Sequence, residues 1–497
     1  MSLLGLDVGS TSIKGVVFNE KGSIKAQASA QFKTIWHENT AESDAEMMWK
    51  AAAEVIKAAA QKSPDIEAIC VSSHGETYIP VDENCKPVYC AVMNSDNRAV
   101  KESASWEKNI GKRNMYAITG VPLHPMFSIN KIMWLKNNKP DIFAGAKMFL
   151  SPGDYILGRL GVALLTDYSL AGRTMAFDIN KRSWSDDILK EAGIRKDMMP
   201  QCVPSGTLAG TIKADIARML GLNKGVVAVV GGHDQPLSAL GCGAIAEGQV
   251  SDSAGTYECL AAISDTPKNN DSAYEYNLNS YCHVVERKYI TLAFFPAGFA
   301  TSWFVDEFCG EDKQRAKKKK IPVYLYLSQK IPKEPTGICI TPHFVGSCNP
   351  YWDMRARGAI YGLAPDSSRH KLFKAVYEGL ALELSLNVQV LAQVCGEFDS
   401  IRISGGNAKW PFSLQLRCDI TGKSFYTMDT TQTVCKGAAM LAGIACGIYR
   451  DCADAVQKTV QTDKEYKPDK DVSESYERQK AMYRALYPSL NKVREFK

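Results

Sequence analysis

The sequence predicts an α/β protein of two similar domains, each built on a mixed five-stranded sheet flanked by helices. The chain has 497 residues, more than one hydrophobic core usually organises, so two large domains are expected. Short apolar runs that end at glycine-rich turns alternate with long helical patterns, as in α/β folds. A strand–turn–strand pattern that opens the chain returns near its middle, which indicates an internal duplication.

The first half of the chain begins with strands and continues with a long helix. Apolar runs at residues 3–6 and 15–18 predict two strands around a turn of small residues, and residues 19–22 predict the hairpin turn to a third strand. A helical pattern at 45–61 precedes a buried strand at 66–71. A β-meander followed by a helix and a strand is the order of a ribonuclease-H-like layer.

The second half repeats this opening more faintly. Residues 249–264, QVSDSAGTYECLAAIS, predict a strand, a small-residue turn and a second strand. We place the boundary near residue 245, in the Gly/Ala-rich segment 240–248, which gives domains 1–245 and 246–497. The later elements that we expect are a strand at 400–404 and helices at 367–394, 412–420 and 436–447, the last with small residues that allow close approach to a sheet.

Composition limits the class of function. A net charge of +5, with 45% hydrophobic and 23% charged residues, is ordinary for a soluble globular protein and argues against a dedicated nucleic-acid binder. The 15 cysteines include no C-x-x-C pair, so we expect buried thiols in a reducing compartment rather than a zinc site. The chain has no signal-peptide pattern and no run of about 18 apolar residues. We therefore expect a cytoplasmic protein without a membrane span.

One acidic residue stands at the end of a predicted buried strand. Residues 227–235, VAVVGGHDQ, run from apolar residues through two glycines to Asp234. Open α/β sheets bind ligands at the carboxyl ends of their strands. A single carboxylate there is well placed to take a proton from a substrate hydroxyl. From this segment alone, a loop aspartate that makes a turn hydrogen bond is the alternative.

The turn between the first two strands has the composition of a phosphate-binding loop. Gly9 lets the backbone approach an anion, successive N–H groups in such a turn can surround a phosphate, and residues 10–12 add hydroxyl groups. Asp7, at the strand end, is placed to hold Mg²⁺ through water, and Lys14 to reach a terminal phosphate. A hairpin turn of small residues is the alternative.

The second half offers matching turns. Gly255 and Thr256 form a second glycine hairpin, and two such hairpins from two domains would hold a nucleotide between them. Residues 404–408, SGGNA, follow a strand and open a helix, so their glycines allow an adenine ring to lie against the backbone. An ordinary glycine loop is the alternative here.

Taken together, these motifs resemble the FGGY carbohydrate kinases, within the actin/Hsp70/hexokinase ATPase superfamily, over nearly the whole chain. Residues 126–138, MFSINKIMWLKNN, fit the first family signature, with Lys131 and Trp134 in place. Residues 358–378 nearly fit the second, with Lys371 where an acid, an amide or histidine is usual. The other matches are the phosphate loops at 7–12 and 255–256, the catalytic segment 231–235, and the adenosine loop 404–408, where Asn407 replaces a common third glycine.

The resemblance implies ATP-dependent phosphorylation of a sugar or polyol hydroxyl in a cleft between two actin-like ATPase domains. Asp234 would be the general base, and Asp7 and Asp234 would hold Mg²⁺. The implied nucleotide-binding residues are Asp7, Gly9, Ser10, Thr11, Ser12, Lys14, Gly255, Thr256, Gly298, Gly405, Gly406 and Asn407. The implied substrate-binding residues are Gly75, Glu76, Thr77, Asp96, Arg98, Met126, Asp234 and Gln235.

The acceptor segments are locally similar to those of glycerol kinases but differ at two positions. Gly75 replaces an arginine and Met126 a tyrosine, which we expect to remove polar donors and open space. The resemblance therefore implies an acceptor other than glycerol, namely a pentulose such as xylulose or a polyol, with Glu76 able to bind two hydroxyls. The aromatic residues Phe294, Phe295, Phe299 and Trp303 are expected to pack in the core rather than on a sugar.

Other neighbours of the acceptor segments leave an alternative open. Asp167, Arg173 and Thr174 match a family loop beside the pocket. In the segment 94–98, Asn94 replaces a usual tryptophan while Asp96 and Arg98 remain. These two charges serve either the substrate or a structural ion pair.

Two other functions compete with a kinase. An ATP-binding regulator or chaperone-like member of the superfamily would keep the phosphate loops and need no base at Asp234. An ATPase that activates a partner protein usually brings paired cysteines for a metal cluster, which the sequence lacks. The partners that we expect are a small-molecule substrate and, by analogy with the family, a second copy of the chain, with no nucleic acid and no membrane.

Overall fold

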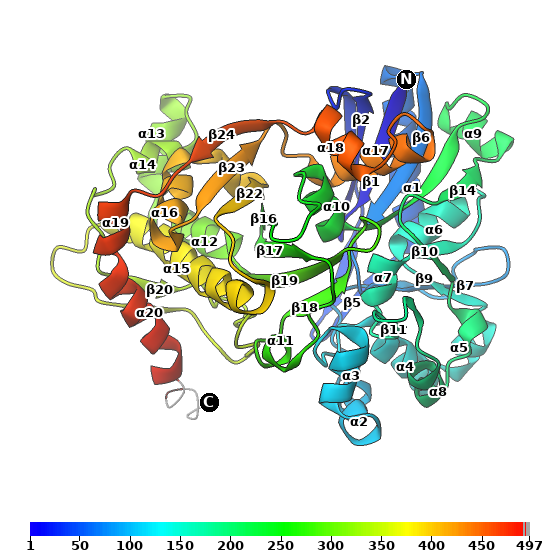
Figure 1. The fold of residues 1–497 in the computed structure, drawn as a ribbon, viewed down its shortest axis with the longest axis horizontal. Coiled ribbons are helices and arrows are strands. Elements are labelled where there is room, and N and C mark those ends of the chain that lie inside the picture. The colour runs from blue at the N-terminus through cyan, green and yellow to red at the C-terminus, as the bar shows by residue number, and fades with distance from the viewer. Residues whose placement is uncertain (491–492, 494–497) are drawn as a thin grey trace.

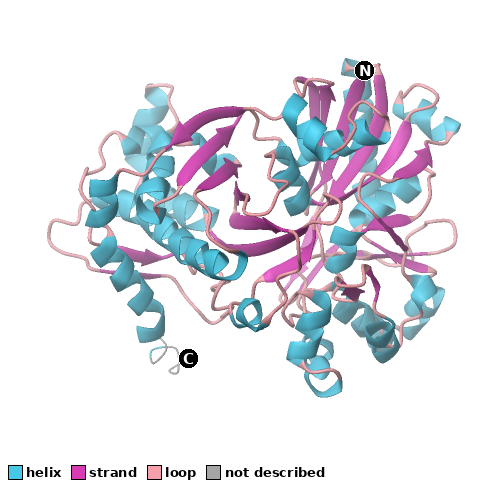
Figure 2. Cartoon of the chain, in the orientation of Figure 1, coloured by secondary structure: helices cyan, strands magenta, loops and turns pink. Residues whose placement is uncertain are grey.

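The computed structural model describes residues 1–490 and 493, so the end of the expected second domain, at 491–492 and 494–497, lies outside the described residues. The chain forms two α/β bodies side by side, and helices flank both sheets (Figures 1 and 2). No helix in the described part of the chain is long and apolar enough to cross a bilayer.

The first sheet has six strands in the order β14-β15-β6-β1-β2-β3. Its central strand β1 is nearly all buried, because α1 covers one face of the sheet and α17 the other. Asp44 begins α1 by accepting the Glu46 N–H through its side chain. The bounds are β1 Ser2–Val8, β2 Ser12–Asn19, β3 Ile24–Gln31, β6 Ile66–Ser73, β14 Leu208–Thr211, β15 Val227–His233 and α1 Ala45–Lys62.

The second sheet has seven strands in the order β18-β19-β17-β16-β22-β23-β24. Its five strands β19-β17-β16-β22-β23 repeat the order of β3-β2-β1-β6-β15, which confirms the expected duplication of a ribonuclease-H-like layer. The bounds are β16 Val250–Ala254, β17 Tyr257–Ser264, β18 Asn279–Cys282, β19 Tyr289–Pro296, β22 Ser400–Ser404, β23 Ser424–Met428 and β24 Thr462–Tyr466.

The expectation of five strands per sheet is wrong at the edges. Antiparallel strands extend both sheets, with β14 added to the first and β18 and β24 to the second. These edge strands are short, and β24 is almost entirely exposed. Such segments lack the alternating or continuous apolar runs that identify a strand, so pattern analysis does not find them.

Two helices join the bodies. Helix α10, Asp234–Gly241, follows β15, and α17, Thr433–Ala445, lies against both α10 and β1 (Figure 1). A Cβ at Gly241 would lie 2.0 Å from the Thr433 carbonyl oxygen, and one at Gly5 would lie 1.9 Å from the Cys435 oxygen. The small residues of α17 therefore approach a sheet closely, as predicted, although the sheet belongs to the first half of the chain.

The remaining strands and helices lie outside the two large sheets. The other strands are β4 Thr34–His37, β5 Thr40–Ser43, β7 Ile79–Val81, β8 Ala91–Val92, β9 Met148–Leu150, β10 Leu165–Asp167, β11 Phe177–Asp178, β12 Ser183–Trp184, β13 Gln201–Val203, β20 Cys339–Thr341 and β21 Ala359–Tyr361. The other helices of the first half are α2 Val100–Asn109, α3 Lys112–Thr119, α4 Ser128–Asn138, α5 Pro140–Gly145, α6 Pro152–Arg159, α7 Tyr168–Gly172, α8 Asp186–Ala192, η1 Lys196–Met198 and α9 Ala214–Leu220. Those of the second half are α11 Asp271–Glu275, α12 Gly298–Phe308, α13 Gly310–Lys318, α14 Val323–Ser328, α15 Arg369–Cys395, η2 Gly406–Lys409, α16 Pro411–Thr421, α18 Cys452–Thr459, α19 Lys470–Ser475 and α20 Glu477–Ser489.

The helix crossing gives a stability prediction. Gly437→Ala is expected to lower the free energy of unfolding by about 1–3 kcal/mol, the usual cost of overpacking. Alanine normally favours a helix interior over glycine, but here its Cβ would lie 2.1 Å from the Leu237 carbonyl oxygen. Gly145→Ala is the control for denaturant unfolding, because a Cβ at this helical glycine would have open space around it in the described part of the chain. Equal effects of the two substitutions would contradict the close contact.

Candidate active site

Asp234, the acidic residue predicted at the end of a strand, lies at the end of β15. Asp234 is the first residue of α10, directly after β15, where the positive end of the helix dipole favours a carboxylate. Its side chain is 27% exposed, and its Oδ1 lies 3.2 Å from Nε2 of His233. That oxygen is buried and makes no hydrogen bond to the described residues. Buried polar atoms in folded proteins are normally satisfied, so this oxygen is available to a ligand.

Carboxylates gather around Asp234. Burial raises the pKa of Asp234 to about 8, and the carboxylates of Asp7 and Glu76 add to the rise, against the opposing charge of Arg173. Burial also raises the pKa of Asp7 to about 6, while Lys14 lowers it. Like charges that face one another in a partly dry site are stabilised by a bound cation.

The first phosphate loop is a tight turn between β1 and β2. The N–H of Gly9 donates to the Ser12 carbonyl at 2.9 Å, which closes the turn. Asp7 pairs in register with Lys14 across the two strands and lies beside Ser72 of β6. The loop residues remain accessible, since Gly9, Ser10 and Ser12 are half-buried and Thr11 is exposed.

The second phosphate loop and the adenosine loop contact one another. The N–H of Gly298 donates to the Thr256 carbonyl at 3.0 Å, and a Cβ at Gly298 would lie 3.1 Å from the Gly255 oxygen. Gly405 has a φ of +97°, and a Cβ there would lie 2.6 Å from the Ala254 oxygen, so only glycine fits. The Asn407 amide lies 3.5 Å from the Gly255 oxygen, and Gly406 is exposed. The predicted nucleotide residues of the second half are thus neighbours.

A chain of hydroxyls links the adenosine loop to the helix that carries Asp234. Ser404, at the end of β22, lies 3.2 Å from the Thr433 hydroxyl at the start of α17. Thr433 in turn lies 2.9 Å from the Ser238 hydroxyl, one helical turn beyond Asp234 in α10. These contacts connect the helix that begins at Asp234 with the end of a strand in the second sheet.

The acceptor segment is held rigidly after β6. Nδ1 of His74 donates to the Val8 carbonyl at 2.9 Å, and Nε2 lies 2.8 Å from the Thr77 hydroxyl. Glu76 has a φ of +61°, and its carbonyl accepts the Ser128 hydroxyl at 2.7 Å. A residue held in this left-handed region is typical of functional sites, where surrounding contacts maintain the strain.

The expectation that Gly75 opens space is wrong. A Cβ at Gly75 would lie 2.7 Å from Cγ and 2.8 Å from Cβ of Arg173, so the Arg173 side chain fills the volume. Arg173 is buried and forms an ion pair with Glu76, its Nε donating to Oε1 at 2.5 Å. A cation is therefore present beside Glu76, but it comes from residue 173 instead of residue 75.

A strand of the second sheet completes this side of the site. Nη1 of Arg173 donates to Oδ1 of Asn279 at 3.0 Å, and the Tyr281 hydroxyl lies 2.7 Å from Nδ1 of His233. Asn279 and Tyr281 lie on β18, and the sequence did not identify either of them. Their strand is short and uniformly buried, so only the sheet topology brings them to Arg173 and His233.

The other predicted acceptor residues divide into two groups. Met126 is half-buried, and its N–H donates to Nδ1 of His124 at 3.2 Å. Asp96 and Arg98 form an ion pair, with Arg98 also bonded to Glu42 at 2.6 Å and Asp96 accepting the Ala41 N–H at 2.7 Å. Asp96 is fully buried, so these contacts favour the structural ion pair that the sequence left open.

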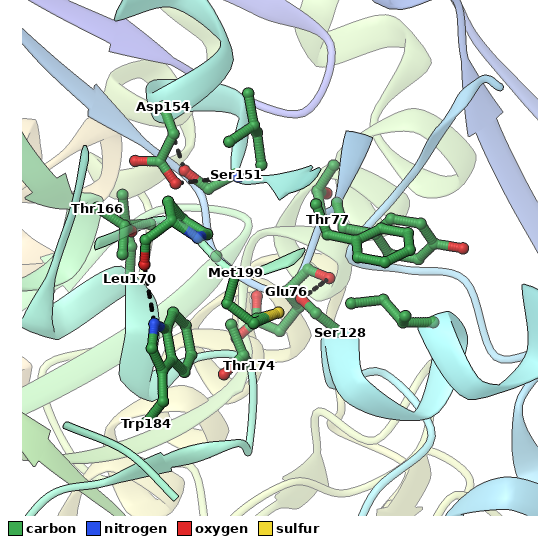
Figure 3. Close-up of a pocket in the computed structure, with 16 residues that line it drawn as sticks. Glu76, Thr77, Ser128, Ser151, Asp154, Thr166, Leu170, Thr174, Trp184 and Met199 are labelled. Carbon is green, nitrogen blue, oxygen red and sulfur yellow. Dashed lines mark hydrogen bonds between the residues drawn. The ribbon is translucent and has the colours of Figure 1, made fainter. Parts of the chain in front are cut away.

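Behind Glu76 lies a small cavity of about 20 Å³ (Figure 3). Thr77, Ser128, Asp154 and Trp184 help to line it, and Asp154 caps α6 through Ser151. Burial raises the pKa of Asp154 to about 7. This volume can hold one water molecule but not a sugar. The cavity therefore lies beside the acceptor segment without binding the acceptor.

The four aromatic residues expected in the core also divide. Phe295 is fully buried, and Trp303 packs against Phe308 and Phe344 with ring centroids 5.2 and 5.0 Å apart. Phe299 is 39% exposed, which contradicts the expectation, and Phe294 is only half-buried. Aromatic side chains exposed in this way lie outside the hydrophobic core.

Two sheets of this topology, joined through a pair of helices and each presenting a glycine hairpin, define a two-domain fold of the actin-like ATPase class. Models of the FGGY family of carbohydrate kinases match residues 2–241, as the N-terminal domain, and 251–446, as the C-terminal domain. The chain therefore belongs to the FGGY family of carbohydrate kinases. Membership confirms the predicted class of enzyme over an ATP-binding regulator without a carbohydrate acceptor.

Individual relatives span almost the full chain. The gluconokinase of Bacillus subtilis is 26% identical, over 95% of this chain and 93% of its own length. The autoinducer-2 kinase of an Enterobacter species is 27% identical, over 98% of this chain and 94% of its own. The solved xylulose kinase of Lactobacillus acidophilus superposes with a TM-score of 0.89 at 26% identity, and the match covers 98% of each chain. By name these relatives act on different acceptors.

Proposed function

We propose that the protein transfers the γ-phosphoryl group of ATP to a hydroxyl of a sugar or polyol longer than glycerol, with a pentulose such as xylulose as the first candidate. The observation that carries this proposal is the placement of Asp234. Its Oδ1 is buried, makes no hydrogen bond to the described residues, and lies at a strand end near Asp7 and Glu76. A carboxylate in that position can take the acceptor proton.

Phosphoryl transfer depends mainly on positioning and on stabilisation of charge. In the proposed reaction Asp234 accepts the hydroxyl proton as the acceptor oxygen bonds to the γ-phosphorus and the bond to ADP breaks. The backbone N–H groups of residues 9–12 and 255–256 bind phosphate oxygens, and Lys14 adds a positive charge. Residues Gly298, Gly405, Gly406 and Asn407 hold the adenosine. Glu76, Gln235 and Met126 contact the acceptor, with Gly75 and Thr77 shaping the segment.

The acidic pair fits a magnesium ion. Asp7 and Asp234 offer carboxylate oxygens, one of them buried without a partner among the described residues, and oxygen is the ligand that Mg²⁺ prefers. When bound, the ion would neutralise charge on the phosphates of ATP. In the proposed enzyme, residues 1–245 bind the acceptor and carry the base, while residues 246–497 bind the nucleoside.

An ADP-release assay over a panel of acceptors tests the proposed function. Ketoses and polyols of four to six carbons are compared with glycerol, each with MgATP and with a no-acceptor blank. At least one longer acceptor is expected to stimulate ADP release well above the blank and above glycerol. ATP hydrolysis that no acceptor stimulates would overturn the kinase proposal, and a preference for glycerol would overturn its acceptor class.

The raised pKa values predict the pH dependence. The base must be ionised, and its pKa is raised, so activity is lost as pH falls through that pKa. The value of kcat/KM for MgATP, which reports the free enzyme, is expected to fall about tenfold per pH unit below a pKa of about 8. The value of kcat is measured with Mg²⁺ bound beside Asp7 and Asp234. The apparent pKa obtained from kcat is therefore expected to be lower than the apparent pKa obtained from kcat/KM. Because Asp7 and Asp234 interact, both apparent values belong to the pair. A flat profile from about pH 6 to 9 would contradict the assignment.

A further inference from the structure

A row of aromatic side chains forms a wall that leads away from Asp234. Cys259 of β17 pairs in register with Phe294 of β19, so the two side chains point to the same face of the second sheet. That face lies toward Asp234, because Cys259 belongs to the same hydrophobic cluster as Tyr281, whose hydroxyl lies 2.7 Å from Nδ1 of His233, the residue before Asp234. The Asp234 carboxylate also adds to the rise that burial produces in the pKa of the Cys259 thiol. Phe294 and Met126 are partly buried side chains that pack against the hydrophobic cluster that contains Cys259.

Trp352 continues the wall. Its ring lies edge-on to Phe294, with centroids 5.2 Å apart, and edge-on to His124 at 5.6 Å. His124 accepts the Met126 N–H, so Trp352 reaches from the second half of the chain to the acceptor segment of the first. In the other direction the row ends at Tyr257, beside the second phosphate loop, with its ring 6.3 Å from that of Phe294.

The backbone of Trp352 adopts an energetically unfavourable conformation. Its φ is +53°, a left-handed conformation that a bulky residue seldom adopts. The loop is fixed by Asn349, which is fully buried, exchanges two hydrogen bonds of 3.1 Å with the backbone of Phe294, and donates to the Asn277 carbonyl at 2.7 Å. Strain that surrounding contacts enforce in this way is characteristic of ligand-contacting positions.

The indole N–H of Trp352 has no hydrogen-bond partner among the described residues, although it is buried. Buried tryptophan N–H groups normally find an acceptor. An oxygen of a ligand seated along the wall would satisfy it. The contacts run from Cys259 through Phe294 to Trp352, so this donor lies at the end of the wall farthest from Cys259.

We propose that Trp352 is a specificity-determining residue, whose ring and indole N–H contact the end of the acceptor carbon chain farthest from the phosphorylated hydroxyl. This inference rests on the proposed carbohydrate kinase function and deepens it. In this arrangement Phe294 and Trp352 cover the C–H face of the acceptor, while Glu76 binds hydroxyls. Because glycerol has only three carbons, only a longer acceptor would contact both the base and Trp352, which gives the preference for longer acceptors a structural cause.

Two substitutions separate the N–H from the ring. Trp352→Phe keeps an aromatic ring and removes the donor, and it is expected to lower kcat/KM for the best longer acceptor about 3- to 10-fold, the usual effect of one hydrogen bond. Trp352→Leu removes the ring as well, and it is expected to lower the same kcat/KM by about 30- to 100-fold. For glycerol, both variants are expected to stay within about twofold of the wild type, as is the KM for ATP, because neither ligand reaches residue 352.

Trp303→Phe is the matched control, since Trp303 is a half-buried tryptophan of the same half of the chain that packs against Phe308 and Phe344. It is expected to leave the ratio of kcat/KM between longer acceptor and glycerol unchanged. Thermal unfolding confirms that each variant is folded. A Trp352→Phe variant that changes all acceptors by one factor, changes none, or alters mainly the KM for ATP overturns the inference alone. A wild-type protein that phosphorylates no acceptor overturns the proposed function first, and the inference with it.

Discussion

Replacing Asp234 with asparagine is expected to lower kcat by about 10²–10⁴-fold, the usual contribution of a general base. Asparagine has nearly the same shape, so it keeps the start of α10 intact, but it cannot accept a proton from the acceptor. The KM for MgATP is expected to change much less than kcat, since the loops proposed to bind phosphate and adenosine lie on other elements and Asp7 remains as a ligand for Mg²⁺. Steady-state kinetics with the best acceptor of the panel measures both quantities.

Asp186→Asn is the control for Asp234→Asn. Asp186 is also the first residue of a helix, α8, but its side chain is exposed and forms a surface ion pair with Lys196. Loss of that pair is expected to have almost no effect on turnover. If Asp234→Asn keeps full activity, the base lies elsewhere and the proposed mechanism is wrong.

The second large effect is expected at Arg173. Arg173→Met leaves the Glu76 carboxylate buried without its cation, and removing one partner of a buried ion pair usually costs about 3–5 kcal/mol of stability. The Glu76 carboxylate also loses the group that holds it in position, which weakens its acceptance of acceptor hydroxyls. We expect kcat/KM for the acceptor to fall about 10²–10³-fold, a loss of the size seen when a buried charged partner is truncated.

A double variant separates stability from function at this pair. Arg173→Met combined with Glu76→Gln removes both charges, so most of the lost stability is expected to return while kcat/KM for the acceptor stays low. Arg195→Met, which breaks an exposed pair with Asp197, is the matched control. A double variant that recovers activity along with stability would show that Glu76 only supports the fold.

Sequence patterns were sufficient for the frame of the molecule and for the segments of the site. The apolar run that ends in two glycines predicts both β15 and the position of Asp234 at its end, because burial and turn geometry are local properties. The same reasoning places the glycine hairpins at 9–12 and 255–256. The roles of these residues stay predictions that the experiments above test.

Contacts between distant residues could not be predicted in this way. The absence of a side chain at Gly75 suggests open space, yet Arg173, 98 positions later in the chain, occupies it. Asn279 and Tyr281 likewise reach the site only because β18 extends the second sheet toward the first half of the chain. Matching a residue to a family position identifies that residue, but it does not identify the side chains that pack beside it.

The glycine contacts between α10 and α17 restrict how the two halves of the enzyme can move. Gly241 and Gly437 bring the helix backbones together with no side chain between them, and Gly5 does the same between β1 and α17, so α17 is fixed against the first sheet and against α10. Asp234 begins α10, one turn from Leu237, which makes the contact with Gly437. Any movement of the second sheet would therefore have to bend the connections that lead to it, while Asp234 stays in place on the first half of the chain.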